Sequence, residues 1–383
     1  MTRLSLGFTL VLAFGVAACG ELDNETTVKD LRVLAVKAEP AGFLVPLDAP
    51  GSIMTTQAKV TALVADPKGQ MATLTVGGEA CPDFIDTITA ATGQTTKVCP
   101  SDAALAASFP QVPPMVRDLL ATQPLPTGTA APTAEWPIQY EPSVTFGLTP
   151  AQIGAFFNDP KANPTGVPTI DLATGYNRDF SFDAIVNLQL GLGGQTASAV
   201  KRLVYWPALT PAQLPADLGL CAYPQVPNQN PIIKAVDFFA ERNEVTGDVE
   251  APYAEVDDMG VKTTLVPRSK GLYVLPSYDP SSAEHYLLRV RKPEQGDAIV
   301  TECKHELLTF SFYATAGTFS PPARQSELLP IFMSDDGKVH LDSQWDPPKP
   351  ENMPKDGKVT VWVVVRDERA GSSWFTRTFT FTN

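Results

Sequence analysis

The feature that most restricts the fold of this chain is a series of short segments in which apolar and polar residues alternate. Within 307–315, for example, three large apolar residues alternate with Thr309, Ser311 and Tyr313. Successive side chains of a β-strand point to opposite faces of the sheet, so this pattern predicts a strand with one buried face. Helical periodicity is almost absent, and the sequence therefore predicts an all-β protein.

The expected strands form two blocks, which are separated by a proline-rich stretch at 207–231. The first block contains candidate strands at 31–38, 58–65, 72–76, 143–147, 184–190 and 197–206. The second block contains candidate strands at 232–239, 261–266, 286–291, 307–315, 359–366 and 374–381. Many short strands in two blocks of this size predict tandem immunoglobulin-like β-sandwiches, at 31–228 and 229–383.

One strand carries a specific prediction about burial. In 58–65, small apolar residues occupy one face, whereas Lys59 and Thr61 lie on the other. This alternation predicts a half-buried strand.

The first block also contains a proline-rich insertion at about 100–142, where regular elements can only be short. We expect one helix there, over 114–122. Directly after the insertion, Thr149 and Pro150 supply an N-cap and a first-turn proline for a short helix through Phe157. The first sandwich is therefore expected to be partly helical.

A glycine-rich segment at 191–194 lies between the candidate strands 184–190 and 197–206. A phosphate-binding loop would continue into Gly-Lys-Ser/Thr and open a helix, and the sequence has neither at this place. We interpret the segment as a hairpin turn.

The chain begins with Arg3, an apolar run at 4–16 and two alanines before Cys19. The run is shorter than the ~20 apolar residues of a membrane-spanning helix, and the three-part pattern is typical of a cleaved export signal. Residues 16–19, Val-Ala-Ala-Cys, resemble the lipobox of bacterial lipoproteins. The resemblance implies that a signal peptide at 1–18 is removed and that Cys19 carries the lipid, including palmitate. An ordinary secretory signal is the alternative.

Residues 19–30 are polar and lack apolar periodicity, which predicts a flexible tether after the lipid. The sequence has no second apolar stretch of membrane-spanning length. We therefore expect the membrane to be contacted through the lipid on Cys19.

The net charge of −13 restricts the partners. Such a charge repels the phosphates of nucleic acids and anionic lipid headgroups, which argues against nucleic acid as a partner. Basic partners remain possible. From the expected envelope location, we expect other envelope proteins or glycans as partners.

Four further cysteines are Cys81, Cys99, Cys221 and Cys303. An even number of thiols in an exported chain favours disulfides, with three possible pairings. We favour Cys81 with Cys99, which closes a short loop, and Cys221 with Cys303 follows by elimination. A zinc site using Cys303 and His305 is the alternative, although two ligands do not make a site.

Catalytic motifs are absent from the sequence. It contains neither Gly-x-Ser-x-Gly nor His-Glu-x-x-His, and His285, His305 and His340 are isolated, which favours structural roles for them. We expect no catalytic residue, no metal and no cofactor.

Two acidic pairs, Asp257-Asp258 and Asp335-Asp336, are the next candidates. A structural role is favoured, because Asp336-Gly337 is a hairpin-turn signal. Calcium is the alternative, since it prefers clustered carboxylates on loops.

The most charged short cluster, Arg366, Asp367, Glu368 and Arg369, lies in the turn of the expected terminal hairpin. Its simplest role is a solvated turn with a weak internal ion pair. The alternative is a recognition loop, because loops at the end of a sandwich often bind partners.

Three tryptophans, Trp136, Trp345 and Trp374, raise a related question. They are either sugar-stacking platforms or packing residues, and packing is the commoner role.

The chain resembles a family of predicted cell-surface lipoproteins with immunoglobulin-like domains, of the kind found in myxobacteria. The resemblance is carried by the stretches 30–40, 227–233, 308–320 and 358–375. The resemblance implies an immunoglobulin-like fold and a location at the cell surface. It implies no activity, because most members of the family have none assigned. Gly20 directly after Cys19, where inner-membrane lipoproteins typically have Asp, implies the outer membrane by the same analogy.

Together these observations lead us to expect a lipid-anchored envelope protein that acts as a non-catalytic binding, adhesion or scaffolding component. One alternative is a carbohydrate-active or other hydrolytic enzyme with its site in 100–225, where no resemblance is found. Another is a calcium-dependent binding module between the two sandwiches.

Overall fold

The computed structural model describes most of the chain, and every structural statement below concerns the described residues. These are residues 26–46, 56–83, 99–108, 114–132, 138–157, 181–243, 246–253, 255–258, 261–267, 271–296, 298–327 and 339–382.

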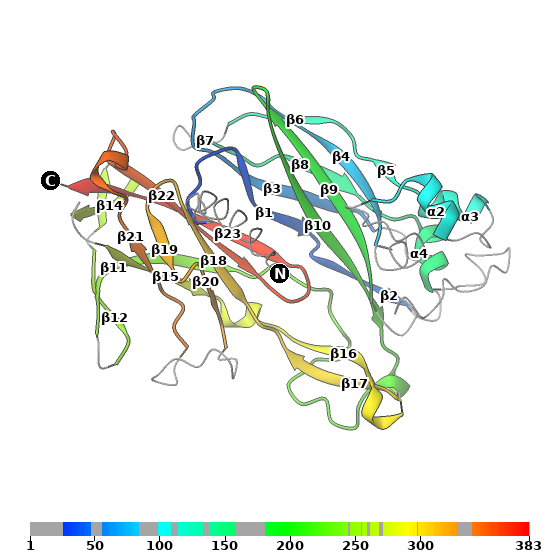
Figure 1. Ribbon diagram of the computed structural model, residues 1–383. Coiled ribbons are helices and arrows are strands. Elements are labelled where there is room, and N and C mark those ends of the chain that lie inside the picture. Colours follow the sequence, from blue (N-terminus) through cyan, green and yellow to red (C-terminus); the bar gives the residue numbers. More distant parts are fainter. Residues whose placement is uncertain are drawn as a thin grey trace, which may run out of the picture.

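The first sandwich consists of two sheets (Figure 1). Sheet I contains β1 (Arg32–Glu39), β3 (Ala58–Asp66), β7 (Ile138–Tyr140) and β8 (Ser143–Phe146), with β7 and β8 both paired to β3. Sheet II contains, in order, β2 (Gly42–Pro46), β10 (Gln195–Ala208), β9 (Phe182–Leu192) and β4 (Leu74–Pro82), with β5 (Gln123–Pro124) and β6 (Gly128–Ala130) both paired to β4.

The second sandwich also has two sheets. Sheet III runs in the order β12 (Val249–Pro252), β11 (Ile233–Arg242), β15 (Leu272–Tyr278), β21 (Ser343–Asp346) and β19 (Thr318–Ser320). Sheet IV runs in the order β13 (Glu255–Asp258), β14 (Val261–Pro267), β23 (Ser372–Thr382), β22 (Lys358–Arg366), β18 (Thr309–Ala314) and β20 (Ala323–Gln325).

The fold class expected from the sequence is confirmed. Most strand pairs are antiparallel, but β2 pairs in parallel with β10 and β14 pairs in parallel with β23. Each sandwich thus joins an early strand to its last strand. The segment at 193–194 forms the tight turn between β9 and β10, with Gly193 and Gly194 at positive φ, so the hairpin prediction is also confirmed.

Three short helices lie in or beside the expected insertion: α2 (Asp102–Ser108), α3 (Pro114–Leu120) and α4 (Pro150–Phe157). The last begins where the sequence predicts it. The backbone N–H of Gln152 donates to Thr149 Oγ1, and the backbone N–H of Thr149 donates to Gln152 Oε1, which is a capping box. None of the described helices has the length and apolar character to cross a bilayer.

A two-stranded arm, β16 (His285–Lys292) and β17 (Ala298–His305), extends from the second sandwich toward the end of β10 (Figure 1). The disulfide Cys221–Cys303 joins it to residues 209–232, the linker between the sandwiches, and Cys81–Cys99 closes a loop in the first sandwich. Both expected pairings are present. Short 3-10 turns lie at Pro211–Gln213, Pro280–Ser282, Pro293–Gln295 and Pro350–Asn352.

The two sandwiches pack against each other through sheets I and IV. Leu63 and Ala65 of β3 form one apolar cluster with Trp362 and Val364 of β22, and all four side chains are fully buried. Each of these strands also buries its other face in its own sandwich core. The expectation of a half-buried strand at 58–65 is therefore wrong, because the second sandwich covers the face that carries Leu63.

The expected tether at 19–30 also needs a correction from residue 26 onward. Thr26 and Val28 are 2 % and 1 % exposed. The backbone N–H of Val28 donates to the carbonyl of Ala314 in β18, and the Ala314 N–H donates to the Thr26 carbonyl. This segment is held against the second sandwich before the chain enters β1 of the first, because its backbone groups find partners at β18.

Candidate functional site

The charged turn between β22 and β23 lies where the two sandwiches, the linker and the arm meet. We call residues 366–372 the junction loop. Its backbone is held by Asp367, whose carboxylate accepts hydrogen bonds from the N–H groups of Arg369 (2.9 Å) and Gly371 (2.6 Å). The same carboxylate accepts from Asn228 Nδ2 of the linker at 3.2 Å. The turn is fixed internally and to the linker.

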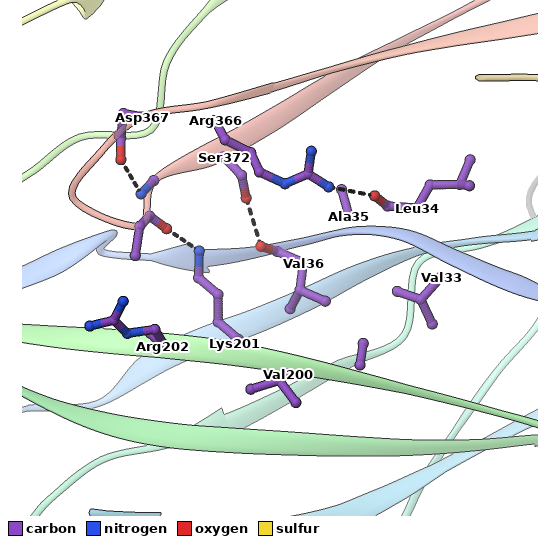
Figure 2. A pocket seen from close by; sticks show the side chains of 13 residues that line it. Val33, Leu34, Ala35, Val36, Val200, Lys201, Arg202, Arg366, Asp367 and Ser372 are labelled. Carbon is purple, nitrogen blue, oxygen red and sulfur yellow. Dashed lines mark hydrogen bonds between the residues drawn. The ribbon is translucent and has the colours of Figure 1, made fainter. Parts of the chain in front are cut away.

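The junction loop and the linker provide donors along one edge of β1, and Figure 2 shows those from the junction loop. Arg366 donates to the carbonyl of Leu34 at 2.9 Å, and the Ser372 hydroxyl donates to the carbonyl of Val36 at 2.6 Å. Asn230 of the linker donates to the carbonyl of Ala38 at 2.7 Å. Alternate carbonyls of β1 thus receive side-chain hydrogen bonds where a neighbouring strand would otherwise bond.

Lys201 reaches the junction loop from the first sandwich. It extends from β10, donates from Nζ to the carbonyl of Ala370 and is 5 % exposed (Figure 2). Burial lowers the pKa of Lys201 to about 8, although Asp367 nearby favours its charged form. The side chain lines a cleft of about 280 Å³ between β1, β10 and the junction loop.

Arg369 connects the junction loop to the base of the arm. Its guanidinium forms ion pairs with Glu306, at 2.9 Å, and with Glu284, and it lies over the ring of Tyr286. Arg369 and Glu306 are 5 % and 0 % exposed. Burial raises the pKa of Glu306 to about 7 despite the hydrogen bond from Arg369, and burial together with Glu368 raises the pKa of Tyr286 to about 12.

The titratable groups of the junction are already engaged in hydrogen bonds and ion pairs. Lys201, Glu306 and Asp367 already bond to backbone or to an opposite charge, and they come from β10, the base of the arm and the junction loop. Shifted pKa values mark functional sites in many proteins, but ion-pair networks that hold a structure together shift them as well. The arrangement at this site fastens separate parts of the chain to one another.

This finding corrects the interpretation of the charged cluster. Of its four residues, Glu368 is exposed, whereas Arg369 is buried and Arg366 and Asp367 are partly buried. The cluster is neither a solvated turn nor a free recognition loop. The physical reason is that the end of this hairpin meets the first sandwich instead of solvent.

The other candidate residues are distributed over the molecule. Cys303 is bonded to Cys221, so it is not available as a zinc ligand. His305 stacks on His285 across the arm with ring centroids 4.3 Å apart, and its Nδ1 contacts Glu327. Within the described ranges, no group of three or more His, Cys, Asp or Glu side chains is placed to hold a metal ion.

The acidic pair Asp257-Asp258 ends β13, opposite Lys262 and Val261 of β14. A calcium site between the two sandwiches would need carboxylates from both of them. The junction carboxylates Glu284, Glu306 and Asp367 all belong to the second sandwich and its arm. Nδ1 of His340 lies 3.9 Å from Oδ1 of Asp342 in the second sandwich.

Three further candidates, Cys19, Trp136 and Asp335-Asp336, lie outside the described residues.

The remaining tryptophans are packing residues. Trp345 is fully buried in the second core, and its Nε1 donates to the Ala316 carbonyl at 2.9 Å. Trp374 is partly buried, with Lys37 over its ring and Glu141 at 3.3 Å from its Nε1. Neither ring is free to serve as a sugar platform.

Sequence reasoning missed Lys201, Glu306 and Asn228. A signal existed for Lys201, because it occurs on the face of β10 that otherwise carries Ala197, Ala199, Leu203 and Tyr205, and a charge on an apolar face indicates a buried partner. Glu306 and Asn228 stand in segments without clear periodicity, and nothing local marks them.

No family model matches the sequence, and no curated protein matches it. Solved structures that align with it include a red sea bream transglutaminase, at 10 % identity and a TM-score of 0.21 over 93 % of this chain and 32 % of that one. An α-2-macroglobulin from Escherichia coli aligns at 10 % identity and a TM-score of 0.23, over 93 % of this chain and 22 % of that one. The BSP domain of a biofilm-associated protein aligns at 9 % identity and a TM-score of 0.21, over 92 % of this chain and 60 % of that one. The chain spans less than two thirds of each of these structures, and scores this low carry no argument about function.

Proposed function

We propose that this protein is a lipid-anchored component of the outer envelope that binds or scaffolds other molecules without catalysing a reaction. It would present two fused sandwiches as one rigid body on the membrane surface. Cys19 would carry the lipid, and the exposed sheet faces would contact an envelope protein or a glycan.

The observation that supports this proposal best is the junction. A hinged protein keeps its domains mobile, whereas here the charged side chains of the junction bond to backbone and to one another across the two sandwiches. The buried contact between Leu63 and Trp362 adds an apolar interface between the sandwiches. Such an arrangement suits presentation of a fixed surface.

The docked segment at 26–28 supports the same proposal. Because Thr26 is held at β18, a lipid on Cys19 would be joined to the folded body by a chain that spans at most ~23 Å, at ~3.3 Å per residue. The lipid would therefore hold both sandwiches close to the membrane, since the segment contacts the second and leads directly into the first.

Affinity purification from membranes tests the proposal. The natively processed protein and a Cys19→Ala variant would be captured from matched membrane and soluble fractions, and their partners identified by mass spectrometry. We expect the wild type in the membrane fraction, with envelope components that the variant loses. Equal membrane retention of Cys19→Ala, or turnover of an added substrate by the purified protein, would contradict the proposal.

A further inference from the structure

A second feature, far from the junction, is a wide groove on the outer face of sheet II. Its volume is about 790 Å³, which lies within the range of roughly 300–1,000 Å³ typical of ligand-binding sites. It crosses β4, β9 and β10, three neighbouring strands of the sheet. These strands lie side by side in Figure 1.

The register of the strands arranges the groove as rows across the sheet. In one row Thr75, Gly191 and Thr196 are paired neighbours, and in the next Gly77 pairs with Gln189, which in turn pairs with Ser198. A third row places Asn187 opposite Val200. Residues between these positions, such as Leu188 and Leu190, point into the core. The polar side chains thus share the outer face.

Glycine keeps the floor of the groove low. At Gly191, an added Cβ would lie 2.8 Å from Thr75 Oγ1, and at Gly78, where φ is +136°, it would lie 2.0 Å from the Asn187 carbonyl oxygen. The contact at Gly78 is with backbone and is too short for a side chain, so the close approach of β4 and β9 requires glycine there. At Gly191 the neighbour is the Thr75 side chain, and the missing Cβ leaves room for it.

The lining of the groove is uncharged. None of the thirteen lining residues is charged, although charged residues make up 19 % of the chain. Most side chains that point outward offer hydroxyl and amide groups, and those of Gln189, Thr196 and Ser198 are exposed. Val200, at one end of the groove, is the exposed apolar exception. These groups donate and accept hydrogen bonds equally well, which matches a neutral ligand that carries many hydroxyl groups.

The position in the sheet argues against an extended peptide. A peptide binds to a sheet mainly through backbone hydrogen bonds at an edge strand. The groove is centred on β9, whose backbone pairs with β4 on one side and β10 on the other. Side-chain hydrogen bonds are what this surface offers, and sugar hydroxyls can use them.

We propose that this groove binds a neutral oligosaccharide or polysaccharide strand, laid across β4, β9 and β10. This inference rests on the proposed function and gives it a ligand class. The lining contains no aromatic ring, so binding relies on hydrogen bonds summed over several sugar units. Affinity should increase with the number of sugars.

A glycan array tests the proposal, with the full chain carrying Cys19→Ala so that no lipid contributes to binding. The array holds neutral oligosaccharides of two to eight sugars together with uronic-acid and sulfated ones of matched length. We expect binding to neutral chains that strengthens with length. Binding confined to the acidic glycans, or no glycan binding at all, overturns the proposal.

Variants locate the site. Ser198→Arg fills the groove with a long charged side chain at an exposed position and is expected to abolish binding. Gln189→Ala should weaken it about fivefold, the loss of one hydrogen bond worth ~1 kcal/mol. Thr145→Arg, at an exposed position on β8 in the other sheet of the same sandwich, is the matched control and should bind like the wild type.

The outcomes separate this inference from the proposed function. Equal loss of binding in Ser198→Arg and Thr145→Arg would place the glycan elsewhere and overturn the groove as its site. A wild type that binds no glycan but retains a stoichiometric protein partner on membranes would also overturn it, while the presentation function would stand. A wild type lost from membranes would contradict the presentation function itself.

Discussion

Arg366 of the second sandwich donates a hydrogen bond to the backbone carbonyl of Leu34 in the first, with the two atoms 2.9 Å apart. The donor stands at the end of β22 and the acceptor on the edge of β1, residues that are 332 positions apart in the chain. The same kind of contact recurs in the junction, where side chains of the second sandwich and the linker donate hydrogen bonds to backbone carbonyls of the first sandwich.

Replacing Arg366 should loosen this edge of β1. Arg366→Ala removes a charge-assisted hydrogen bond to a partly buried carbonyl, and we expect the free energy of unfolding to fall by about 2 kcal/mol. Urea unfolding measures the change. Lys59→Ala, at the one exposed position of β3, is the control and should change stability by less than about 0.5 kcal/mol. Equal effects would show that the contact with Leu34 contributes nothing.

The buried pair Arg369–Glu306 should respond asymmetrically to substitution. Arg369→Met leaves Glu306 buried without its partner, and we expect a loss of about 3–5 kcal/mol. The double variant Arg369→Met/Glu306→Gln removes the stranded charge and should recover a large part of that loss. A double variant that is as unstable as the sum of both single variants would contradict a direct pairing, as a double-mutant cycle would reveal.

Lys201 predicts a pH dependence of stability. Its pKa in the folded protein is lowered to about 8 from 10.5, so between these values the unfolded chain binds more protons than the folded one. Stability from this group is therefore present above pH 10.5 and is lost as the pH falls through about 8. The wild type should gain stability relative to Lys201→Met as the pH rises from 8 to 10. A constant difference between the two proteins over that range would refute the assignment.

The disulfide Cys221–Cys303 should stabilise the arm more than the sandwiches. In the variant with both cysteines changed to serine, we expect faster amide hydrogen exchange in β16 and β17, with the strands of sheet II little changed. The matched variant lacking Cys81 and Cys99 should alter exchange in the first sandwich instead. Uniform acceleration in both variants would contradict an arm that is locally fastened to the linker.

The architecture was predictable because it depends on local patterns. Alternation identifies β18, the Thr149-Pro150 pair identifies the start of α4, and glycines identify the turn between β9 and β10. Each of these signals lies within a few residues of the element that it predicts.

The junction was not predictable for the opposite reason. The burial of Leu63 and of the junction loop depends on which sheet covers them, and the covering residues are hundreds of positions away. A short charged turn has the same sequence whether it faces water or another domain. In hindsight, Trp362 and Val364 on the second face of an already apolar strand indicated that β22 is buried on both faces.

If the two sandwiches form one rigid body, the distance between a spin label on each sandwich has a single value, which a distance distribution measures. Labels at Met71→Cys in the first sandwich and Glu250→Cys in the second are at exposed positions, in a Cys19→Ala background whose other cysteines are in disulfides. We predict a single narrow distribution that broadens in the double variant Arg366→Ala/Arg369→Met. A broad or multiple distribution in the otherwise unaltered protein would show that the sandwiches move independently and do not form one rigid body.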